Sequence, residues 1–572
     1  MDVAEMHDRR WWALAVLAGS LLVITLDNTI LNVAIPSLVR DLDASTSELQ
    51  WIIDGYVIVF AGLLLTAGAL GDRFGRKGML QIGLAIFGVT SLWASMADSP
   101  TQLILARAFM GVGGAMIMPS TLSLLTNIFR DAKERGRAIG VWAAVAGASG
   151  ALGPVLGGLL LRWFGWGSVF LVNVPIIITM LIAGKFLLPT SKAPNKTRLD
   201  PVGAVLSIAA LVALLFGVIE TPVKGWADPL VVAAFGIGLT MLAAFIAWEL
   251  HVDEPMLDMR FFANPRFTAA NMAITLVFFA MFGQMFVMTQ YLQIVLGYEA
   301  LEAGLRMLPM SVVMLCTAPL APRLVEKIGT KLVVGGGLCL VAVGVFTLST
   351  IPVTDGYPRV ITGMIILAFG MALTMAPATE SIMGSLPPAK AGIGSAMNDT
   401  TRQMGGALGV AVLGSILAGV YRPAVESGLT DIGVGEPALG TAVDSVGGAL
   451  TQVAPQLPAD VGAQVVDVAA AAYVDGAHLA MRVGGVVILV AAAVVFAFLP
   501  ARARDAREDE EGPLDGLASL TWAEAEGVLE HDAAVDHGLI GADADPHFDD
   551  GDPPPPSPPS RGRADSGADS GR

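Results

Sequence analysis

The stretch that decides the fold is GALGDRFGRKG, residues 68–78, which lies between two apolar runs at 49–70 and 79–97. Its glycines permit a tight turn between two helices. Asp72 can pair with basic groups or face the positive N-terminal end of a neighbouring helix. The spacing of a phosphate-binding loop, Gly-x-x-x-x-Gly-Lys-Ser/Thr, is not matched. We predict a conformational latch made of Gly68, Asp72, Arg73, Gly75, Arg76 and Lys77.

Apolar runs like the two beside this turn recur from residue 11 to residue 499. The chain is 54% hydrophobic and 15% charged, whereas soluble domains are about 25% charged. A hydrocarbon core about 30 Å thick needs roughly 20 apolar residues per helix. We therefore predict an all-α polytopic membrane protein with fourteen transmembrane helices. The predicted spans are 14–36, 49–70, 79–97, 102–125, 139–161, 168–188, 202–220, 229–249, 267–290, 304–322, 332–351, 359–383, 401–420 and 480–499.

Basic residues alternate between the gaps that separate these runs. Gaps such as 130–137 and 185–198 are rich in Lys and Arg, whereas 98–101 has none. Because loops rich in Lys and Arg stay in the cytoplasm, we predict a multi-pass protein of the cytoplasmic (inner) membrane with both termini cytoplasmic. Segment 423–479 has no Lys or Arg and is predicted to be extracytoplasmic. It forms either a short helical cap or an unstructured loop.

Most of the formal net charge of −16 belongs to the C-terminal tail. Residues 501–572 contain 18 acidic and six basic residues and a proline run at 553–556. A segment this polar cannot bury a core, so we predict a disordered cytoplasmic tail. The two cysteines lie in apolar runs and the histidines have no metal-binding spacing, so we expect no metal or other cofactor. We also expect no nucleic-acid partner and no enzymatic site.

A few charged residues lie within the predicted spans, where each costs about 2.5 to 3.5 kcal/mol on insertion scales. They include Asp27 in the first span, Asp54 in the second and Arg107 in the fourth. We predict that Asp27 and Arg107 meet as the core of a proton and cation site, with Asp54 as an outer relay or structural partner. A polar pair that only fixes helix packing is the alternative, and it competes more strongly for Asp54 than for Asp27.

A second group of charges lies near the ends of the twelfth and thirteenth spans. Glu380, Asp399 and Arg402 could also couple protons to substrate, or they could extend to the lipid headgroups. For Glu220 and Glu249, at the ends of the seventh and eighth spans, we expect contact with headgroups.

Small residues concentrate in the fifth span, within 147–158. Gly153, Gly157 and Gly158 permit close approach of another helix, and Pro154 removes a backbone hydrogen bond and bends the span. The alternative, ordinary small-residue packing, explains the glycines but explains their arrangement around Pro154 less well.

The ninth span, 267–290, is rich in Met and Phe, which suit a cavity that accepts many hydrophobic shapes. Lipid-facing and packing positions use the same residues, so packing remains the alternative for most of them. The candidates for contact with substrate are Asn271, Phe282, Gln284, Met285 and Gln290.

Two internal repeats indicate a two-bundle design. The 71–77 turn has a weak counterpart at 321–331, and residues 135–140 resemble 391–396. Repeated halves around a midplane site are common in transporters. The predicted parts are a cytoplasmic N-terminus, two six-helix bundles separated by a linker with two extra helices, and the tail. Their bounds are 1–13, 14–188 (first bundle), 189–250 (linker), 251–500 (second bundle, including loop 423–479) and 501–572.

Together these segments resemble the signature motifs of the major facilitator superfamily, in particular its 14-span drug/proton antiporter family, over about residues 11–500. Residues 72–77 match the loop motif and 26–36 resemble the span-1 motif. Residues 103–119 match the span-4 motif, whose arginine, here Arg107, is implicated in proton coupling. Gly153, Pro154, Gly157 and Gly158 match the antiporter motif, and 290–309 also resembles 14-span members.

The resemblance implies the major facilitator fold, with two helices inserted between the bundles, and no enzymatic activity. It implies a monomeric proton-coupled antiporter that exports hydrophobic or cationic drugs, dyes or an endogenous natural product. The chain departs from the pattern in the tenth span, which has no acidic residue. Two alternatives stay open: a proton-coupled metabolite carrier of the same fold, and a non-transporting membrane sensor, which would need a folded signalling domain.

Overall fold

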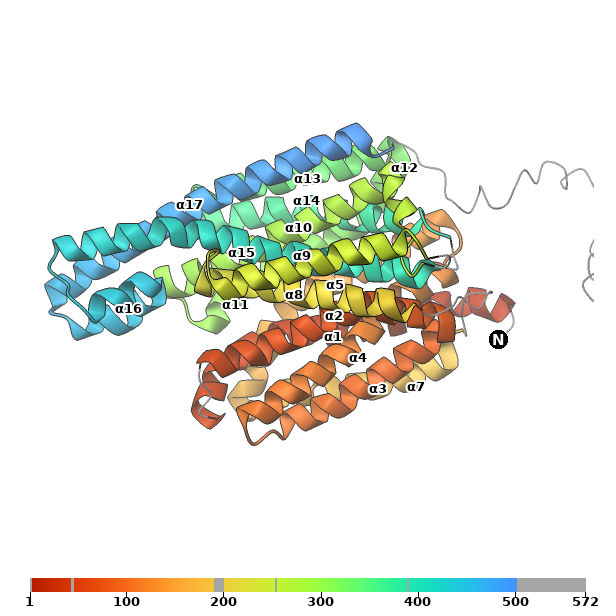
Figure 1. The fold of residues 1–572 in the computed structure, drawn as a ribbon, viewed down its shortest axis with the longest axis horizontal. Helices are drawn as coiled ribbons and strands as arrows, with labels where there is room; N and C mark the ends of the chain where they lie inside the picture. The colour runs from red at the N-terminus through yellow and green to blue at the C-terminus, as the bar shows by residue number, and fades with distance from the viewer. Residues whose placement is uncertain (1–2, 43–45, 190–199, 253–254, 388–389, 501–572) are drawn as a thin grey trace, which may run out of the picture. The chain divides into compact units, whose positions relative to one another are not determined.

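The computed structural model describes residues 3–42, 46–189, 200–252, 255–387 and 390–500, and every regular element in these ranges is a helix (Figure 1). The predicted tail, 501–572, lies outside the described residues. The helices before the linker are α1 (Val3–Leu42), α2 (Thr46–Phe74), α3 (Arg76–Ser95), α4 (Pro100–Ile128), α5 (Ala132–Trp163), α6 (Ser168–Leu171) and α7 (Asn173–Leu187). Helices α8 (Pro201–Lys224) and α9 (Pro229–Glu249) form the inserted pair and lie alongside each other.

The second bundle begins with the short η1 (Met259–Ala263) and the long α10 (Pro265–Gln290), which ends in one π-helical turn, η2 (Tyr291–Val295). Its further helices are α11 (Ala300–Thr317), η3 (Ala318–Leu320), α12 (Ala321–Ile328), α13 (Thr330–Leu348), α14 (Tyr357–Met383), α15 (Ala391–Asp431), α16 (Ala438–Asp444), η5 (Gly448–Val453), η6 (Ala454–Gln456) and α17 (Ala459–Phe498).

Several helices begin at a cap that can be read in the sequence. A side-chain oxygen accepts a hydrogen bond from a backbone amide of the first turn, and proline follows as the first helical residue, where its missing N–H costs nothing. These cap and proline pairs are Ser99-Pro100, Asp200-Pro201, Asp228-Pro229 and Asn264-Pro265. They fix the starts of α4, α8, α9 and α10.

In the 68–78 stretch, a single residue separates two helices. Helix α2 ends at Phe74 and α3 begins at Arg76, and Gly75 between them has φ 113°. The counterpart in the second bundle has the same form, because Gly329, with φ 87°, is the one residue between α12 and α13. Residues with a Cβ rarely adopt such φ values. The weak sequence repeat therefore corresponds to a repeated backbone geometry.

Within the described residues, thirteen helices are long and apolar enough to cross a membrane. The predicted fifth span, 139–161, lies in α5, a helix of 32 residues that is not among the thirteen and has several side chains outside the described part. The all-α polytopic fold is confirmed. Fourteen membrane crossings remain a prediction.

Two hydrophobic cores follow the predicted bundles. One is built almost wholly from α1 to α7, and includes the fully buried Tyr56, Phe87 and Trp142. The other is built from α10 to α17. The inserted α8 packs against α2 and α15, so it contacts both bundles.

Segment 423–479 is helical over most of its length. Helix α15 continues to Asp431 and α17 already begins at Ala459, and the short α16, η5 and η6 connect them. Buried Val425, Leu429 and Val465 give this part an apolar core. Of the two predicted alternatives for this segment, the structure shows the helical cap and not the unstructured loop. The predicted bounds of the last two spans were too short, because apolar length marks only the membrane-embedded part of a helix that continues beyond it.

Candidate proton and substrate site

Asp27 of α1 and Arg107 of α4 form a buried ion pair between four helices. Arg107 Nε also donates to the carbonyl oxygen of Ile52 at 3.1 Å, and its guanidinium carbon lies 4.3 Å from the centre of the Tyr56 ring, both on α2. Asn173 Nδ2 of α7 donates to Asp27 Oδ1 at 3.2 Å. Asp27 is 0% and Arg107 1% exposed. A carboxylate and a guanidinium are thus held together away from water.

Glycines of α4 bring α2 within reach of Arg107. A Cβ at Gly111 would lie 2.8 Å from the Tyr56 carbonyl oxygen, and one at Gly114 would lie 3.1 Å from the Tyr56 hydroxyl. Both glycines follow Arg107 by one or two helical turns, on the same face. The glycine-rich part of the span-4 motif therefore sets the helix spacing that places Tyr56 over the guanidinium.

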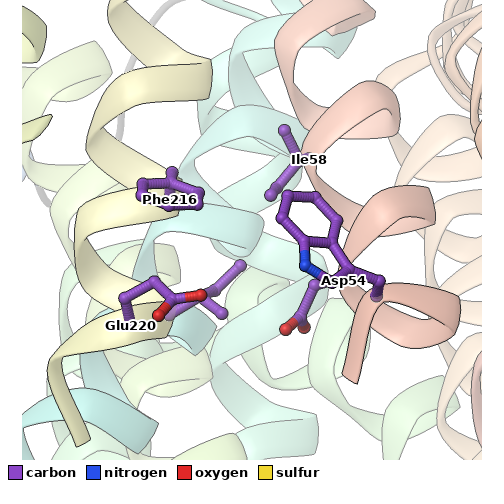
Figure 2. A pocket seen from close by; sticks show the side chains of 6 residues that line it. Asp54, Ile58, Phe216 and Glu220 are labelled. Carbon is purple, nitrogen blue, oxygen red and sulfur yellow. The ribbon is translucent and has the colours of Figure 1, made fainter. Parts of the chain in front are cut away.

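Asp54 lies away from this pair. Residues 52 and 56 are four apart and share one face of α2, so residue 54 between them points to the other side. Figure 2 shows Asp54 and Ile58 facing Phe216 and Glu220 of α8, in a small pocket that Trp51 and Ile219 also line. The structure therefore assigns Asp54 to the contact with the inserted pair and does not join it to Asp27.

The Asp72 carboxylate bridges the two bundles. It accepts hydrogen bonds from the backbone amides of Gly392 at 2.9 Å and Ile393 at 3.2 Å, at the N-terminus of α15. It also accepts from Arg76 Nε at 2.9 Å and Nη2 at 2.7 Å. A carboxylate at a helix N-terminus satisfies free amides and interacts favourably with the helix dipole. The structure thus has both contacts that the sequence suggested for Asp72, and its function as a latch stays a prediction.

Glycines let the two helices meet at this bridge. A Cβ at Gly68 would lie 2.6 Å from the Gly392 carbonyl oxygen, and one at Gly392 would lie 2.6 Å from both the Gly68 carbonyl oxygen and Asp72 Oδ1. Lys77 secures the other side of the turn, since its Nζ donates to the carbonyl oxygens of Lys185 and Leu188 at the end of α7. The remaining basic residue of the motif, Arg73, lies over the ring of the neighbouring Phe74.

The glycines of the fifth span hold α5 against α1. A Cβ at Gly153 would lie 2.0 Å from Thr29 Oγ1 and 2.9 Å from the backbone nitrogen of Ile30. Thr29 Oγ1 donates to the Ser149 carbonyl oxygen at 3.1 Å. Gly157 is buried and Gly158 partly buried on the next turn, and the side chain of Pro154 lies outside the described part of the chain.

The family model described as "Major Facilitator Superfamily" matches residues 17–410 of the chain. The chain belongs to the major facilitator superfamily. Among its relatives in the superfamily is the multidrug efflux pump LfrA of Mycolicibacterium smegmatis, which is 38% identical over 487 residues, or 85% of this chain and 96% of LfrA.

Two other relatives are resistance proteins by name. The tetracenomycin C resistance and export protein of Streptomyces glaucescens is 33% identical over 515 residues, covering 89% of this chain and 95% of that protein. The methyl viologen resistance protein SmvA of Salmonella typhimurium is 33% identical over 499 residues, covering 87% of this chain and 100% of SmvA.

Solved structures of the superfamily share the fold. The human organic anion transporter MFSD10 superposes with a TM-score of 0.57 at 13% identity, covering 86% of this chain and 99% of that one. The proton:xylose symporter XylE superposes with a TM-score of 0.55 at 15% identity, covering 88% and 99%.

Within the major facilitator fold of this chain, Asp399 and Arg402 are buried inside the protein. Asp399 is 0% and Arg402 3% exposed. Arg402 Nη2 donates to Thr379 Oγ1 at 3.2 Å, and Asn398 Nδ2 donates to Asp399 Oδ1 at 3.3 Å. Extension to headgroups is therefore wrong for this pair, because both side chains are buried and Arg402 contacts Trp142, Phe278 and Thr379 of three neighbouring helices.

Glu380 joins the bundles at the same end as Asp72. It accepts from Arg135 Nε and forms an ion pair with Arg135 Nη2, both at 2.7 Å. Arg135 is at the start of α5 and Glu380 near the end of α14, and the guanidinium is 1% exposed. Glu380 therefore binds an arginine of the first bundle, and contact with lipid headgroups does not explain its position.

The expectation of headgroup contact was also wrong for Glu249. Glu249 is 3% exposed and accepts from the Leu257 amide at 3.0 Å, so it fastens the segment that follows α9 to the end of that helix. Glu220 pairs with Lys224 at 3.1 Å and lines the Asp54 pocket. Glu220 is turned towards α2, and its contact with headgroups stays a prediction.

The substrate candidates of α10 divide into two groups. Asn271 and Gln284 are 4% and 1% exposed, and each has a side-chain oxygen without a hydrogen-bond partner. Phe282 is 37% exposed and packs on Gly406, and Met285 and Gln290 are partly exposed. The structure holds these five on one helix, and their contact with substrate stays a prediction.

Sequence reasoning missed the partners of the charged groups. Asn173 is a polar residue within an apolar run, which could have marked it as a partner of a buried charge. Tyr56 and Trp142 look like ordinary core aromatic residues in the sequence. Their roles depend on helix rotation, which the sequence pattern does not specify.

Proposed function

We propose that this chain exports hydrophobic or cationic drugs, dyes or an endogenous natural product in exchange for protons. The observation that carries the proposal is the buried Asp27–Arg107 pair, in a chain whose relatives are named as multidrug efflux and resistance proteins. A membrane-embedded charge costs several kcal/mol on insertion scales, so it is retained where transport uses it.

Asp27 is the group that exchanges its proton for a cationic or amphipathic passenger. A carboxylate in a desolvated site is stabilised by a nearby cation and destabilised by burial. Arg107 holds the carboxylate in place through its further contacts with Ile52 and Tyr56. Protonation of Asp27 would break this arrangement and change how α1 and α4 pack. The reaction needs no covalent chemistry, metal or cofactor.

The described contacts between the bundles support a closed path at one end, which we name the basic end. There the Asp72 bridge joins α2 to α15, and an ion pair joins Arg135 of α5 to Glu380 of α14. Helix α5 also packs closely on η3, because a Cβ at Gly140 would lie 3.3 Å from the Ala318 carbonyl oxygen. Because this end carries the Lys- and Arg-rich loops, we infer that it faces the cytoplasm. We propose a monomer in the inner membrane with both termini cytoplasmic, and a conformation in which the cytoplasmic path is closed.

The test is ethidium transport in inverted membrane vesicles under an imposed pH gradient. The wild type should accumulate ethidium when the lumen is acidic, and Asp27→Asn and Arg107→Ala should lose this transport, measured per amount of folded protein in the membrane. Asp98→Asn, at an exposed loop position, is the matched control and should transport normally. Undiminished transport by Asp27→Asn would remove Asp27 from the mechanism, and absence of gradient-driven transport by the wild type would overturn the function.

A further inference from the structure

Arg402 is enclosed by two aromatic rings that belong to different bundles. Its guanidinium carbon lies 4.8 Å from the centre of the Trp142 ring of α5 and 5.3 Å from that of the Phe278 ring of α10. An aromatic face attracts a guanidinium, and more strongly when water is excluded. Thr379 of α14 accepts its Nη2 hydrogen bond. Trp142 is therefore the contact of Arg402 with the first bundle, whereas Phe278 and Thr379 belong to its own bundle.

Asp399, three residues earlier on α15, is buried beside this arginine without a hydrogen bond to it. Asp399 Oδ2 and Arg402 Nε are both buried and have no hydrogen-bond partner. Asp399 Oδ1 accepts only a long bond from the neighbouring Asn398, among the bonds of the described residues. Residues three apart on a helix can reach each other. A buried carboxyl group and a buried guanidinium thus lie within reach and have no hydrogen bond between them.

Trp142 is held firmly to the first bundle. It is fully buried, and its Nε1 donates to Thr121 Oγ1 of α4 at 3.3 Å. Alternating access moves one repeated half against the other around the central site. When the basic end opens, α5 moves away from α15, so the Trp142 ring leaves Arg402 while Phe278 and Thr379 stay.

We infer that Trp142 positions Arg402 for proton exchange at Asp399. While the basic end is closed, the Trp142 ring holds the guanidinium away from Asp399, which keeps its proton. When the bundles part, Arg402 turns to Asp399, the carboxyl O–H bond breaks, and the proton passes to water at the basic end. The guanidinium then balances the charge of the carboxylate. This inference rests on the proposed function and adds a second proton site.

Several charged groups on neighbouring helices have partners of their own, including Arg266 of α10, which donates to the Gly384 carbonyl oxygen at 3.4 Å. On α14, Glu380 is paired with Arg135, and on α2, Asp72 is paired with Arg76. On α4, Arg107 is paired with Asp27. Asp399 accepts a hydrogen bond from the Asn398 amide, and Arg402 lies one helical turn away on the same helix. The position of Arg402 therefore decides whether Asp399 holds a proton.

The test compares Trp142→Leu with Phe278→Leu in purified full-length protein. Infrared spectroscopy with Asp399→Asn as reference identifies the band of the protonated Asp399 carboxyl. We expect this band in the wild type and in Phe278→Leu, and its loss in Trp142→Leu, because only Trp142 belongs to the opposite bundle. Trp142→Phe keeps a ring and should restore much of the band. A band in Trp142→Leu equal to that of the wild type overturns the inference.

Transport in liposomes gives the second readout. Ethidium efflux driven by a pH gradient should fall roughly tenfold in Trp142→Leu, whereas ethidium exchange without a gradient should persist. Loss of both transport modes with an unchanged carboxyl band would mean that Trp142 is only structural and would overturn the inference. If the wild type shows no gradient-driven efflux, the proposed function fails, and the infrared comparison still tests the positioning of Arg402.

Discussion

The buried Arg107 makes three contacts: an ion pair with Asp27, a hydrogen bond to the Ile52 carbonyl oxygen and a cation–π contact with the Tyr56 ring. Removing one partner of a buried pair leaves an uncompensated charge, which costs about 3–5 kcal/mol. Arg107→Ala should therefore destabilise the folded protein by about that amount. The double variant Asp27→Asn/Arg107→Ala should lose clearly less than the sum of the two single variants. The measurement is unfolding in detergent, followed by tryptophan fluorescence and analysed as a double-mutant cycle.

Additive effects in that cycle, to within about 0.5 kcal/mol, would show that the two side chains do not interact energetically. Ser91→Ala is a useful control. Its hydroxyl is buried on α3 and has no hydrogen-bond partner, so its loss should change stability little.

At the same scale, a charge within an apolar run could be recognised from the sequence, but its partner could not. Asp27 and Arg107 are conspicuous because few charges lie in the spans, and their pairing followed from their similar depth. Asp54 has a similar depth, yet it faces Phe216 and Glu220 of α8. Depth follows from the position along a helix, whereas the direction of a side chain depends on helix rotation, which packing determines.

The contact between α1 and α5 shows what a glycine contributes to a whole helix. An added Cβ at Gly153 meets Thr29 Oγ1 at 2.0 Å and also the backbone of Ile30, so Gly153→Ala must move the helices apart. We expect a loss of about 1–3 kcal/mol in the free energy of unfolding and a lower rate of ethidium transport. Thermal unfolding measures the loss of stability, and vesicle assays on the same preparation measure the rate of ethidium transport.

Gly236→Ala of α9 is the matched substitution, because an added Cβ there meets no atom within 4 Å. It should keep or slightly raise stability, since alanine favours helix over glycine. Equal stability losses at Gly153 and Gly236 would contradict the close-packing explanation.

Element boundaries followed from the sequence where a local signal marks them. The cap and proline pairs fix the starts of α4, α8, α9 and α10, and glycines fix the turns at 75 and 329. The ends of α15 and the start of α17 could not be predicted from apolar length. The extensions of both helices carry acidic residues, but Val425 and Leu429 bury one face of α15 in the apolar core of segment 423–479. This tertiary packing stabilises the helix beyond its membrane-embedded part.

Over the whole molecule, the two bundles repeat one arrangement at the basic end. In the first bundle, the end of α2 meets the start of α15, with Gly68 against Gly392. In the second, η3 and α12 meet the start of α5, where a Cβ at Gly136 would lie 3.7 Å from Pro322 Cβ. The counterpart of Asp72 in the repeated turn is Glu326, which pairs with Lys133 of α5 at 3.9 Å. That pair is exposed, whereas the Asp72 carboxylate is buried and also bonds the first amides of α15. The closed end is therefore fastened asymmetrically, and Asp72 is the position at which one substitution should loosen it.

Asp72→Asn should shift the protein towards opening at the basic end. The amide cannot pair with Arg76 as an ion, and it weakens the charge-assisted bonds to the Gly392 and Ile393 amides, each worth about 1.5–3 kcal/mol. The open population should rise roughly tenfold. Spin labels at exposed Arg137 and Lys327, in a variant with Cys316 and Cys339 replaced by serine, report the distance between the bundles. Glu302→Gln breaks an ion pair with Arg306 inside the second bundle and should leave the distances unchanged. If Asp72→Asn gives the wild-type distance distribution, the latch does not control opening, and the closed end depends on helix packing and on the Arg135–Glu380 pair.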